Sequence, residues 1–132
     1  MRSVIISSVL LIILIVAIAV NAYYINKIST EMLDLVFSLP SEYEYINGLD
    51  ETEVEKYKTE INKLSSKWVE NSFRISLVTR YSDFERVNSA VYSLKEYFFA
   101  EHYADYAAAR QKLIAALEKQ KQNELPIFEN IF

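Results

Sequence analysis

The chain has 132 residues, enough for one small domain and too few for two. Apolar residues make up 52% and charged residues 24%, with 1 Gly and 2 Pro, which excludes disorder, collagen-like repeats and an ordinary all-β fold. The chain has no Cys, which excludes thiol chemistry, and a single His, which excludes a His-based metal cluster. Its net charge of −4 argues against nucleic-acid binding. No cofactor or metal is expected.

The first predicted element is an apolar helix. Residues 3–26 carry no charge, and 15 of the 17 residues from Val4 to Val20 are Val, Ile, Leu or Ala. A helix of this length spans about 36 Å, enough to cross a hydrocarbon core of about 30 Å. We therefore expect residues 1–26 to be a transmembrane anchor that contacts the lipid bilayer through residues 3–26. The expected membrane-interface residues are Arg2, Tyr23, Tyr24 and Lys27.

The same segment has features of a cleaved signal peptide. Small-x-small sequences end at Ala19 and Ala22. The apolar run is longer than the usual h-region of about 7–15 residues, and its basic start is Arg2 alone, which favours a retained anchor. A short N-terminal arm favours a single-pass protein with its N-terminus inside the cell membrane and its C-terminal domain outside. Secretion after cleavage near Ala19 or Ala22 is the alternative.

Residues 27–132 are predicted to form an extracytoplasmic helical bundle. Apolar residues recur there at intervals of mostly 3 and 4, the spacing of one helix face. Four such rows follow one another: Ile25, Ile28, Met32, Leu35 and Leu39; Val54, Tyr57, Ile61, Leu64 and Trp68; Phe84, Val87, Val91, Leu94 and Phe98; and Tyr106, Ala109, Leu113, Ala116 and Leu117. The first row predicts that the membrane helix continues unbroken to about Leu39-Pro40. The predicted fold is all-α, with the transmembrane helix continuing into a small antiparallel bundle of three to four helices.

Turn and capping residues indicate where the helices begin and end. Residues 40–49, which include Pro40 and Gly48, are predicted to form a loop. Capping boxes predict helix starts at Asp50, with Glu53, and at Ser82, with Glu85. Residues 73–78 alternate like a strand but also continue a helical row, so a helix or an irregular linker is expected. The apolar C-terminal tail is expected to pack over the bundle, with a docking peptide as the alternative.

Two polar clusters contain residue types that are typical of chemical sites. The acidic run over residues 42–55 fails the calcium-loop spacing, because Gly48 falls at the seventh position, and acids in a first helical turn suit the helix dipole. His102 lies between Glu101 and Asp105, an arrangement that could serve a hydrolase. No nucleophile, second His or phosphate loop accompanies it. We therefore expect no catalytic residues and no enzyme.

Aromatic residues crowd the junction between the last two predicted helices: Tyr92, Tyr97, Phe98, Phe99, Tyr103 and Tyr106. Such residues are typical both of a core corner and of a partner surface. The expected partner contacts are Tyr97, Phe99, Tyr103, Phe128 and Phe132, and the expected partner is another membrane protein. The sequence thus predicts a membrane-anchored interaction or accessory protein. The alternative is a secreted bundle that binds a ligand in an aromatic-lined cavity.

The chain combines an N-terminal apolar helix, a second helix containing Trp68, a helical hairpin and the terminal Glu129-Asn130-Ile131-Phe132. In this combination it resembles a family catalogued as domain of unknown function 4363. Residues 71–81 and 97–106 depart from the charged pattern of that family. The resemblance implies a small bacterial membrane-anchored helical protein with no assigned activity. It also implies a gene near those of small multi-pass membrane proteins, which suggests an accessory role. It brings no catalytic residues.

Overall fold

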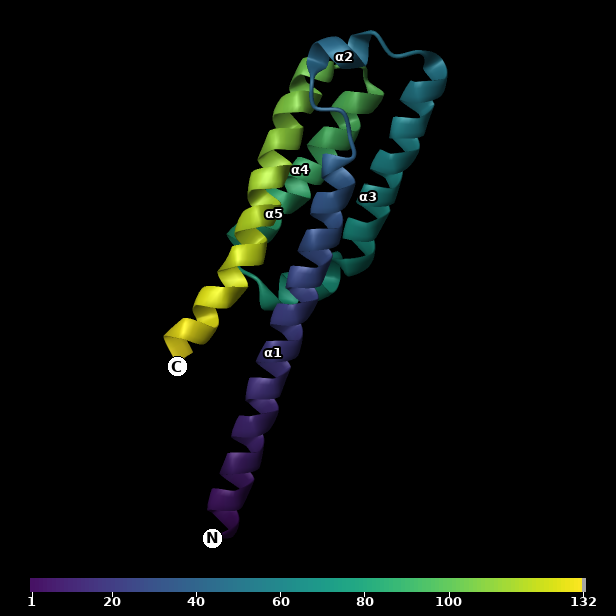
Figure 1. Ribbon diagram of the computed structural model, residues 1–132. Coiled ribbons are helices and arrows are strands. Elements are labelled where there is room, and N and C mark those ends of the chain that lie inside the picture. The colour runs from purple at the N-terminus through teal and green to yellow at the C-terminus, as the bar shows by residue number, and fades with distance from the viewer. Residues whose placement is uncertain (132) are drawn as a thin grey trace.

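Figure 1 shows the computed structural model, in which four long helices form a bundle and one of them extends beyond it. The structure describes the backbone of residues 1–131 and the side chains of residues 1–122. In that part of the chain the elements are α1 (Arg2–Phe37), α2 (Tyr43–Asn47), α3 (Glu51–Val78), α4 (Tyr81–Phe99) and α5 (Tyr103–Ile131). The predicted all-α fold is confirmed, including the apolar N-terminal helix that continues into the bundle.

Helix α1 runs unbroken from the apolar segment into the bundle. It contains no Gly or Pro, so nothing interrupts its backbone hydrogen bonds, and it ends at Phe37 with Ser38 as the C-cap. Ile25 is the first fully buried residue, and the Tyr24 hydroxyl donates a hydrogen bond to Asn71 of α3. The bundle therefore takes up α1 from Tyr24 onward. We call the part before it, residues 2–23, the shaft.

The four long helices are arranged in a ring in the order α1, α3, α4, α5, and each runs antiparallel to both of its neighbours (Figure 1). The four predicted apolar rows supply most of the core. Trp68 is fully buried in this core, and its ring stacks on Phe84 at a centroid distance of 5.3 Å. The Trp68 Nε1–H donates to Asn88 Oδ1 at 2.8 Å, so the one polar atom of this indole is satisfied inside the bundle.

One polar contact ties α1 to α5 within the core. The Gln120 Nε2–H donates to Ser29 Oγ at 2.8 Å, and both residues are buried. Buried polar groups of this kind are stabilising only when they are paired, so the contact favours one register of α5 against α1.

The connection between α1 and α3 differs from the predicted loop. Residues 40–49 contain α2, which begins after Glu42 and ends at Gly48. The helix is there because Ile46, which is buried, closes the top of the core, and one buried residue creates no periodicity that a sequence could reveal. The Tyr106 hydroxyl donates to the buried Pro40 carbonyl oxygen at 2.8 Å and so fastens this connection to α5.

The two predicted capping boxes have opposite outcomes. Asp50 caps α3 as expected, because its Oδ1 accepts from the Glu53 N–H at 2.8 Å. The prediction at Ser82 is wrong: α4 begins at Tyr81, its N-cap is Arg80, and no side chain caps it. Between the two helices only Thr79 and Arg80 intervene, so residues 73–78, whose structure was ambiguous, are the last turns of α3.

Candidate functional site

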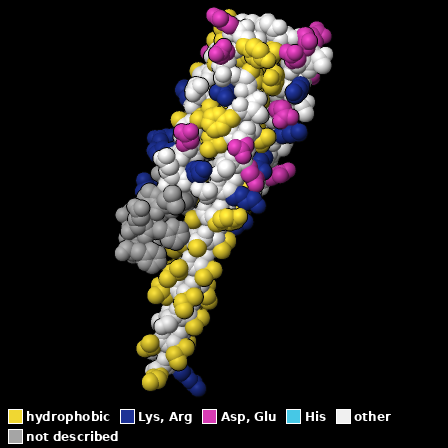
Figure 2. Space-filling model, in the orientation of Figure 1, with side chains coloured by type: hydrophobic (Ala, Val, Ile, Leu, Met, Phe, Trp, Pro, Cys, Tyr) yellow, Lys and Arg dark blue, Asp and Glu magenta, His cyan; other side chains and the backbone are white. Residues whose placement is uncertain are grey.

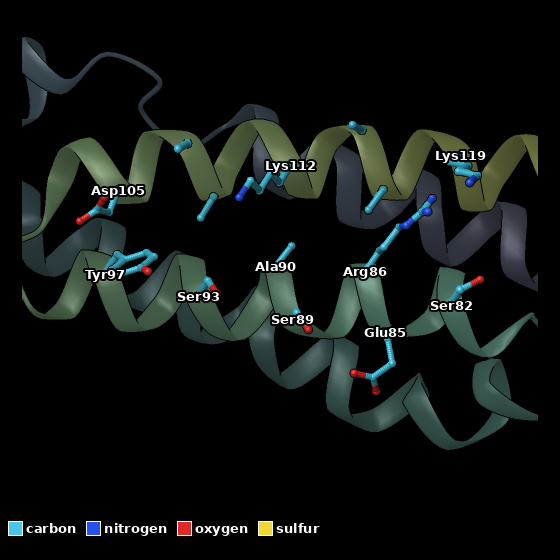
Figure 3. A pocket seen from close by; sticks show the side chains of 14 residues that line it. Ser82, Glu85, Arg86, Ser89, Ala90, Ser93, Tyr97, Asp105, Lys112 and Lys119 are labelled. Atoms are coloured by element: carbon cyan, nitrogen blue, oxygen red, sulfur yellow. The ribbon is translucent and has the colours of Figure 1, made fainter.

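A groove of about 670 Å³ lies between α4 and α5 (Figure 3). It exists because both helices present small side chains to it where neighbouring faces carry large ones. The small lining residues are Ser82, Ser89, Ala90 and Ser93 of α4 and Ala108, Ala109, Ala115 and Ala116 of α5. Small residues on facing helices let α4 and α5 pack closely, and the space between the larger side chains that flank them forms the groove.

Charged side chains of both signs line the groove: the cations Arg86, Lys112 and Lys119 and the carboxylates Glu85 and Asp105. Figure 3 shows Arg86 reaching from α4 toward α5, whereas Glu85 points away from the groove. Lys112 and Lys119 line it from α5, and the Lys119 Nζ lies 3.6 Å from Asp83 Oδ1. Within the described part of the chain, the groove contains hydroxyl groups but no histidine to activate one. Its chemistry suits binding.

The aromatic cluster divides into a buried and an exposed half. The ring of Phe98 packs edge-on against those of Tyr103, at 5.5 Å, and Tyr106, at 5.0 Å. Burial raises the pKa of both tyrosine hydroxyls, and Tyr103 is only 9% exposed, so it offers a partner little surface. Tyr97 and Phe99 are 36% and 39% exposed. The core interpretation therefore holds for Phe98, Tyr103 and Tyr106, and the partner-surface interpretation stays a prediction for the exposed residues.

Tyr97 and Phe99 face different sides of α4. Tyr97 lines the α4–α5 groove. The Phe99 ring instead lies below the ammonium groups of Lys58, at 5.5 Å, and Lys95, at 5.7 Å. The structure therefore does not bring Tyr97 and Phe99 onto one surface. Phe128 and Phe132, also predicted as contacts, lie outside the described side chains.

The predicted membrane-interface residues lie along the lower part of α1. Arg2 and Tyr23 are exposed on the shaft, and Lys27 is exposed beside the bundle. Tyr24 instead packs against α3, where the Arg74 guanidinium lies 3.7 Å from the centre of its ring. Tyr24 thus marks the level at which the shaft meets the bundle.

His102 takes part in the turn between α4 and α5 through its backbone. Its N–H donates to the Tyr97 carbonyl at 2.9 Å, the Glu101 N–H donates to the Phe98 carbonyl, and Glu101 has a φ of +62°. This is the Schellman pattern of helix ends. Among the described residues, no hydrogen bond joins the imidazole to Glu101 or Asp105, and no three His, Asp or Glu side chains are placed to hold a metal ion.

Sequence reasoning missed the groove, although a signal for it was present. Ser82, Ser89 and Ser93 repeat at helical spacing on the face of α4 that borders Arg86 and Tyr97. A row of small polar residues does not register in a search for apolar rows.

The comparisons with known proteins give no relative for this chain. No protein-family model, no curated protein and no solved structure matches it. The resemblance to the domain of unknown function 4363 family therefore stays a prediction, and no residue role is taken from it.

Proposed function

We propose that the protein is a single-pass membrane protein whose helical bundle, outside the cytoplasm, holds another membrane protein in an accessory role without catalysing a reaction. The N-terminus lies inside, and the α4–α5 groove receives a segment of the partner. Residues 3–23 span the bilayer; the last three residues of the expected span 3–26 are left out because Tyr24 packs against α3 and Ile25 is fully buried. Tyr97 borders that groove and is the best-placed of the predicted contact residues.

The bare shaft is the observation that carries the proposal. Helix α1 is long and apolar enough to cross a membrane, and none of its most apolar 18-residue window is buried inside the bundle. Most of the large side chains between Val4 and Val20 are 49–67% exposed, as on a helix that nothing covers (Figure 2). A surface of this size and apolarity is costly in water and is stable in lipid.

The anchor is tested on the full chain in native membranes. We expect the protein to stay in the pellet after a carbonate wash and intact mass spectrometry to find the shaft still attached. The absence of Cys allows clean single-site labelling. A membrane-impermeant maleimide should label Ser66→Cys, on the exposed face of α3, in intact cells and should not label Ser3→Cys. The reverse labelling pattern contradicts the proposed orientation.

The groove is tested by photocrosslinking in the same membranes. A photoreactive residue at Ser89 should crosslink to a discrete membrane protein, and one at Ser66, on another face of the bundle, should not. Ser93→Trp should fill the groove and abolish the Ser89 crosslink, whereas Ser66→Trp should leave it unchanged. Equal crosslinking from Ser89 and Ser66, or an unchanged Ser89 crosslink in Ser93→Trp, removes the groove from the proposal.

A secreted bundle is the second candidate, and one observation favours it. Ala19 and Ala22 both precede Tyr24, so cleavage after either would keep the hydrogen bond from Tyr24 to Asn71 and every buried residue of the core, the first of which is Ile25. A mature protein in the medium that begins at Val20 or Tyr23 would establish this alternative, and the groove would then be its ligand site.

A further inference from the structure

The last turns of α3 expose large apolar side chains that the bundle does not use. Phe73 and Leu77 are 76% and 69% exposed, and Tyr81, directly after the turn, is 78% exposed. Ile75, on the opposite face of α3, is fully buried. The inner face of α3 therefore fills the core while its outer face presents an apolar surface. We call the exposed residues Phe73, Leu77 and Tyr81 the outer patch.

The outer patch lies at the end of the bundle from which the shaft emerges. Asn71 accepts the hydrogen bond from the Tyr24 hydroxyl, and Arg74 stacks on the same ring at 3.7 Å. Residues 73–81 are therefore beside α1 at the level where its apolar surface begins. Figure 1 shows the α3–α4 turn at this end, next to the point where α1 leaves the other helices.

The chain from the outer patch to the α3–α4 turn carries more basic than acidic groups. Residues 71–82 include Arg74 and Arg80 and no Asp or Glu, while the exposed Glu70 lies one turn before Phe73, on the side away from the turn. The next carboxylate along the chain, that of Asp83, is nearly buried and forms an ion pair with Lys119. Lys27, three residues after Tyr24 on α1, is a further exposed cation near this end of the bundle. An apolar surface bordered by exposed cations is typical of protein segments that lie in the headgroup region of a membrane.

From this placement we propose that residues 73–81 form a second membrane contact, in which Phe73, Leu77 and Tyr81 enter the headgroup region of an anionic lipid surface and Arg80 binds lipid phosphates. The contact rests on the proposed anchoring of the shaft, because only a spanning α1 brings the α3–α4 turn down to the bilayer. It fixes the tilt and rotation of the bundle about α1, since a helix held at one point by lipid is otherwise able to rotate.

A lipid surface explains the outer patch better than a second copy of the chain. Two copies facing each other through this patch would bring like charges together at Arg74 and Arg80, which is unfavourable in an interface. A lipid surface offers apolar and anionic groups at the same depth, and a tyrosine at such a boundary can keep its hydroxyl in water.

The test uses the full chain in vesicles, with an environment-sensitive fluorophore at one introduced cysteine. Leu77→Cys reports on the outer patch, and Ile12→Cys reports on the shaft. Tyr92→Cys, on α4 and 54% exposed, is the control for an exposed apolar position higher on the bundle. The vesicles are phosphatidylcholine with or without phosphatidylglycerol, and brominated acyl chains serve as the quencher.

We expect bromolipid to quench residue 12 in both lipids, residue 77 several-fold more with phosphatidylglycerol than without it, and residue 92 in neither. Quenching at residue 12 with none at residue 77 overturns the second contact and leaves the anchor standing. No quenching at residue 12 overturns the anchor itself. A blue-shifted emission at residue 77 without bromolipid quenching indicates that a second copy of the chain covers the patch. Equal quenching at residue 77 in both lipids shows that the contact does not need anionic lipid. Either result overturns the inference.

A charge variant tests the role of Arg80 independently of the label site. A basic side chain at an anionic surface contributes about 1 kcal/mol, so Arg80→Gln should lower the ratio of docked to undocked turn by up to about fivefold in phosphatidylglycerol vesicles. Lys56→Gln, an exposed cation near the start of α3, removes the same charge far from the shaft and should leave this ratio unchanged. Equal effects of the two variants contradict a contact made by Arg80.

Discussion

The two ends of the bundle differ in charge, in connection and in exposed surface. At the distal end, residues 42–55 hold six acidic residues and no Lys or Arg, and the chain crosses it through α2 and the loops around it. At the shaft end only Thr79 and Arg80 join α3 to α4, and the surface is apolar and basic. Figure 2 shows acidic side chains gathered near the distal tip and hydrophobic ones covering the shaft.

Because of this difference in surface charge, the two ends of the bundle interact differently with a membrane, and this favours one orientation of the bundle. An anionic lipid surface attracts the shaft end and repels the distal end, so both terms favour the same upright arrangement of the bundle. The two ends belong to one helical core, and single substitutions can weaken the packing at one end or at the other.

The largest effect is expected from Trp68→Ala, which breaks the core toward the shaft end. It removes the stacking on Phe84 and leaves the Asn88 amide oxygen without its donor, at a cost of about 3–5 kcal/mol in the free energy of unfolding. Chemical unfolding of the full chain in mild detergent, followed by far-UV circular dichroism, measures it. Phe73→Ala, on the same helix but exposed, is the control and should change the free energy by less than about 0.5 kcal/mol. A loss below about 1 kcal/mol for Trp68→Ala would contradict the described core.

A smaller effect, confined to the distal end, is expected from Tyr106→Phe. The Pro40 carbonyl loses the hydroxyl that it accepts from at 2.8 Å, which costs about 1–2 kcal/mol. Hydrogen exchange should accelerate in residues 43–47, while the fluorescence of Trp68 stays unchanged. If hydrogen exchange accelerates equally around Trp68, the two ends unfold as one unit, and the expectation that the effect is confined to the distal end is contradicted.

A stabilising change is expected at the turn between α4 and α5. Glu101 has a φ of +62°, a conformation that costs a residue with a Cβ about 1 kcal/mol and costs glycine little. Glu101→Gly should therefore raise the free energy of unfolding by about 0.5–1 kcal/mol. Ala100→Gly is the matched control, since Ala100 has a φ of −85° and glycine there should destabilise. If both changes stabilise the protein, the gain comes from a general effect of glycine or of lost surface charge, and the explanation by the positive φ of Glu101 is contradicted.

The smallest effect concerns pH and the ion pair between Glu31 and Lys67. The hydrogen bond from the Lys67 ammonium lowers the pKa of Glu31 from its ordinary value of 4.5. A lowered pKa in the folded state means that the pair stabilises the fold above pH 4.5 and that this contribution is lost as the pH falls through the lowered value. Glu31→Gln should lower stability slightly at neutral pH, and the difference from the unaltered chain should vanish at lower pH.

A double-mutant cycle identifies the partner in that pair. The combined change of Glu31→Gln and Lys67→Gln should destabilise no more than either single change, because each alone already breaks the pair. Additive losses from the two changes would show that the residues act separately.

The helical rows were predictable from the sequence because each extends over several turns and buries one face. The Asp50 cap was predictable because its partner, the Glu53 N–H, lies three residues away. The start of α4 was not predictable, because the buried carboxylate of its first turn, Asp83, is paired with Lys119 on another helix. Contacts between residues distant in the chain leave no local pattern.

The outer face of α3 shows a second limit of sequence reasoning. Val69, Phe73 and Leu77 repeat at the same helical spacing as the buried residues of α3, yet they are exposed. Spacing identifies a face of a helix but does not say whether the face turns toward the core. Of the candidate site residues, Tyr97 could be predicted from its aromatic ring, whereas the groove beside it depends on how α4 and α5 pack.

The unbroken backbone of α1 has a mechanical consequence. With no glycine, proline or loop at the junction, the shaft and the first helix of the bundle form one stiff rod of 36 residues, about 54 Å long. With the shaft in a bilayer, a tilt, a twist or a vertical shift of the rod would reach the distal tip undiminished, and a partner pulling on that tip would transmit force back into the lipid. A flexible tether of equal length would transmit neither the movements of the shaft nor the pulling force. An insertion of glycines at Tyr23 would therefore uncouple the shaft from the bundle while leaving the bundle folded.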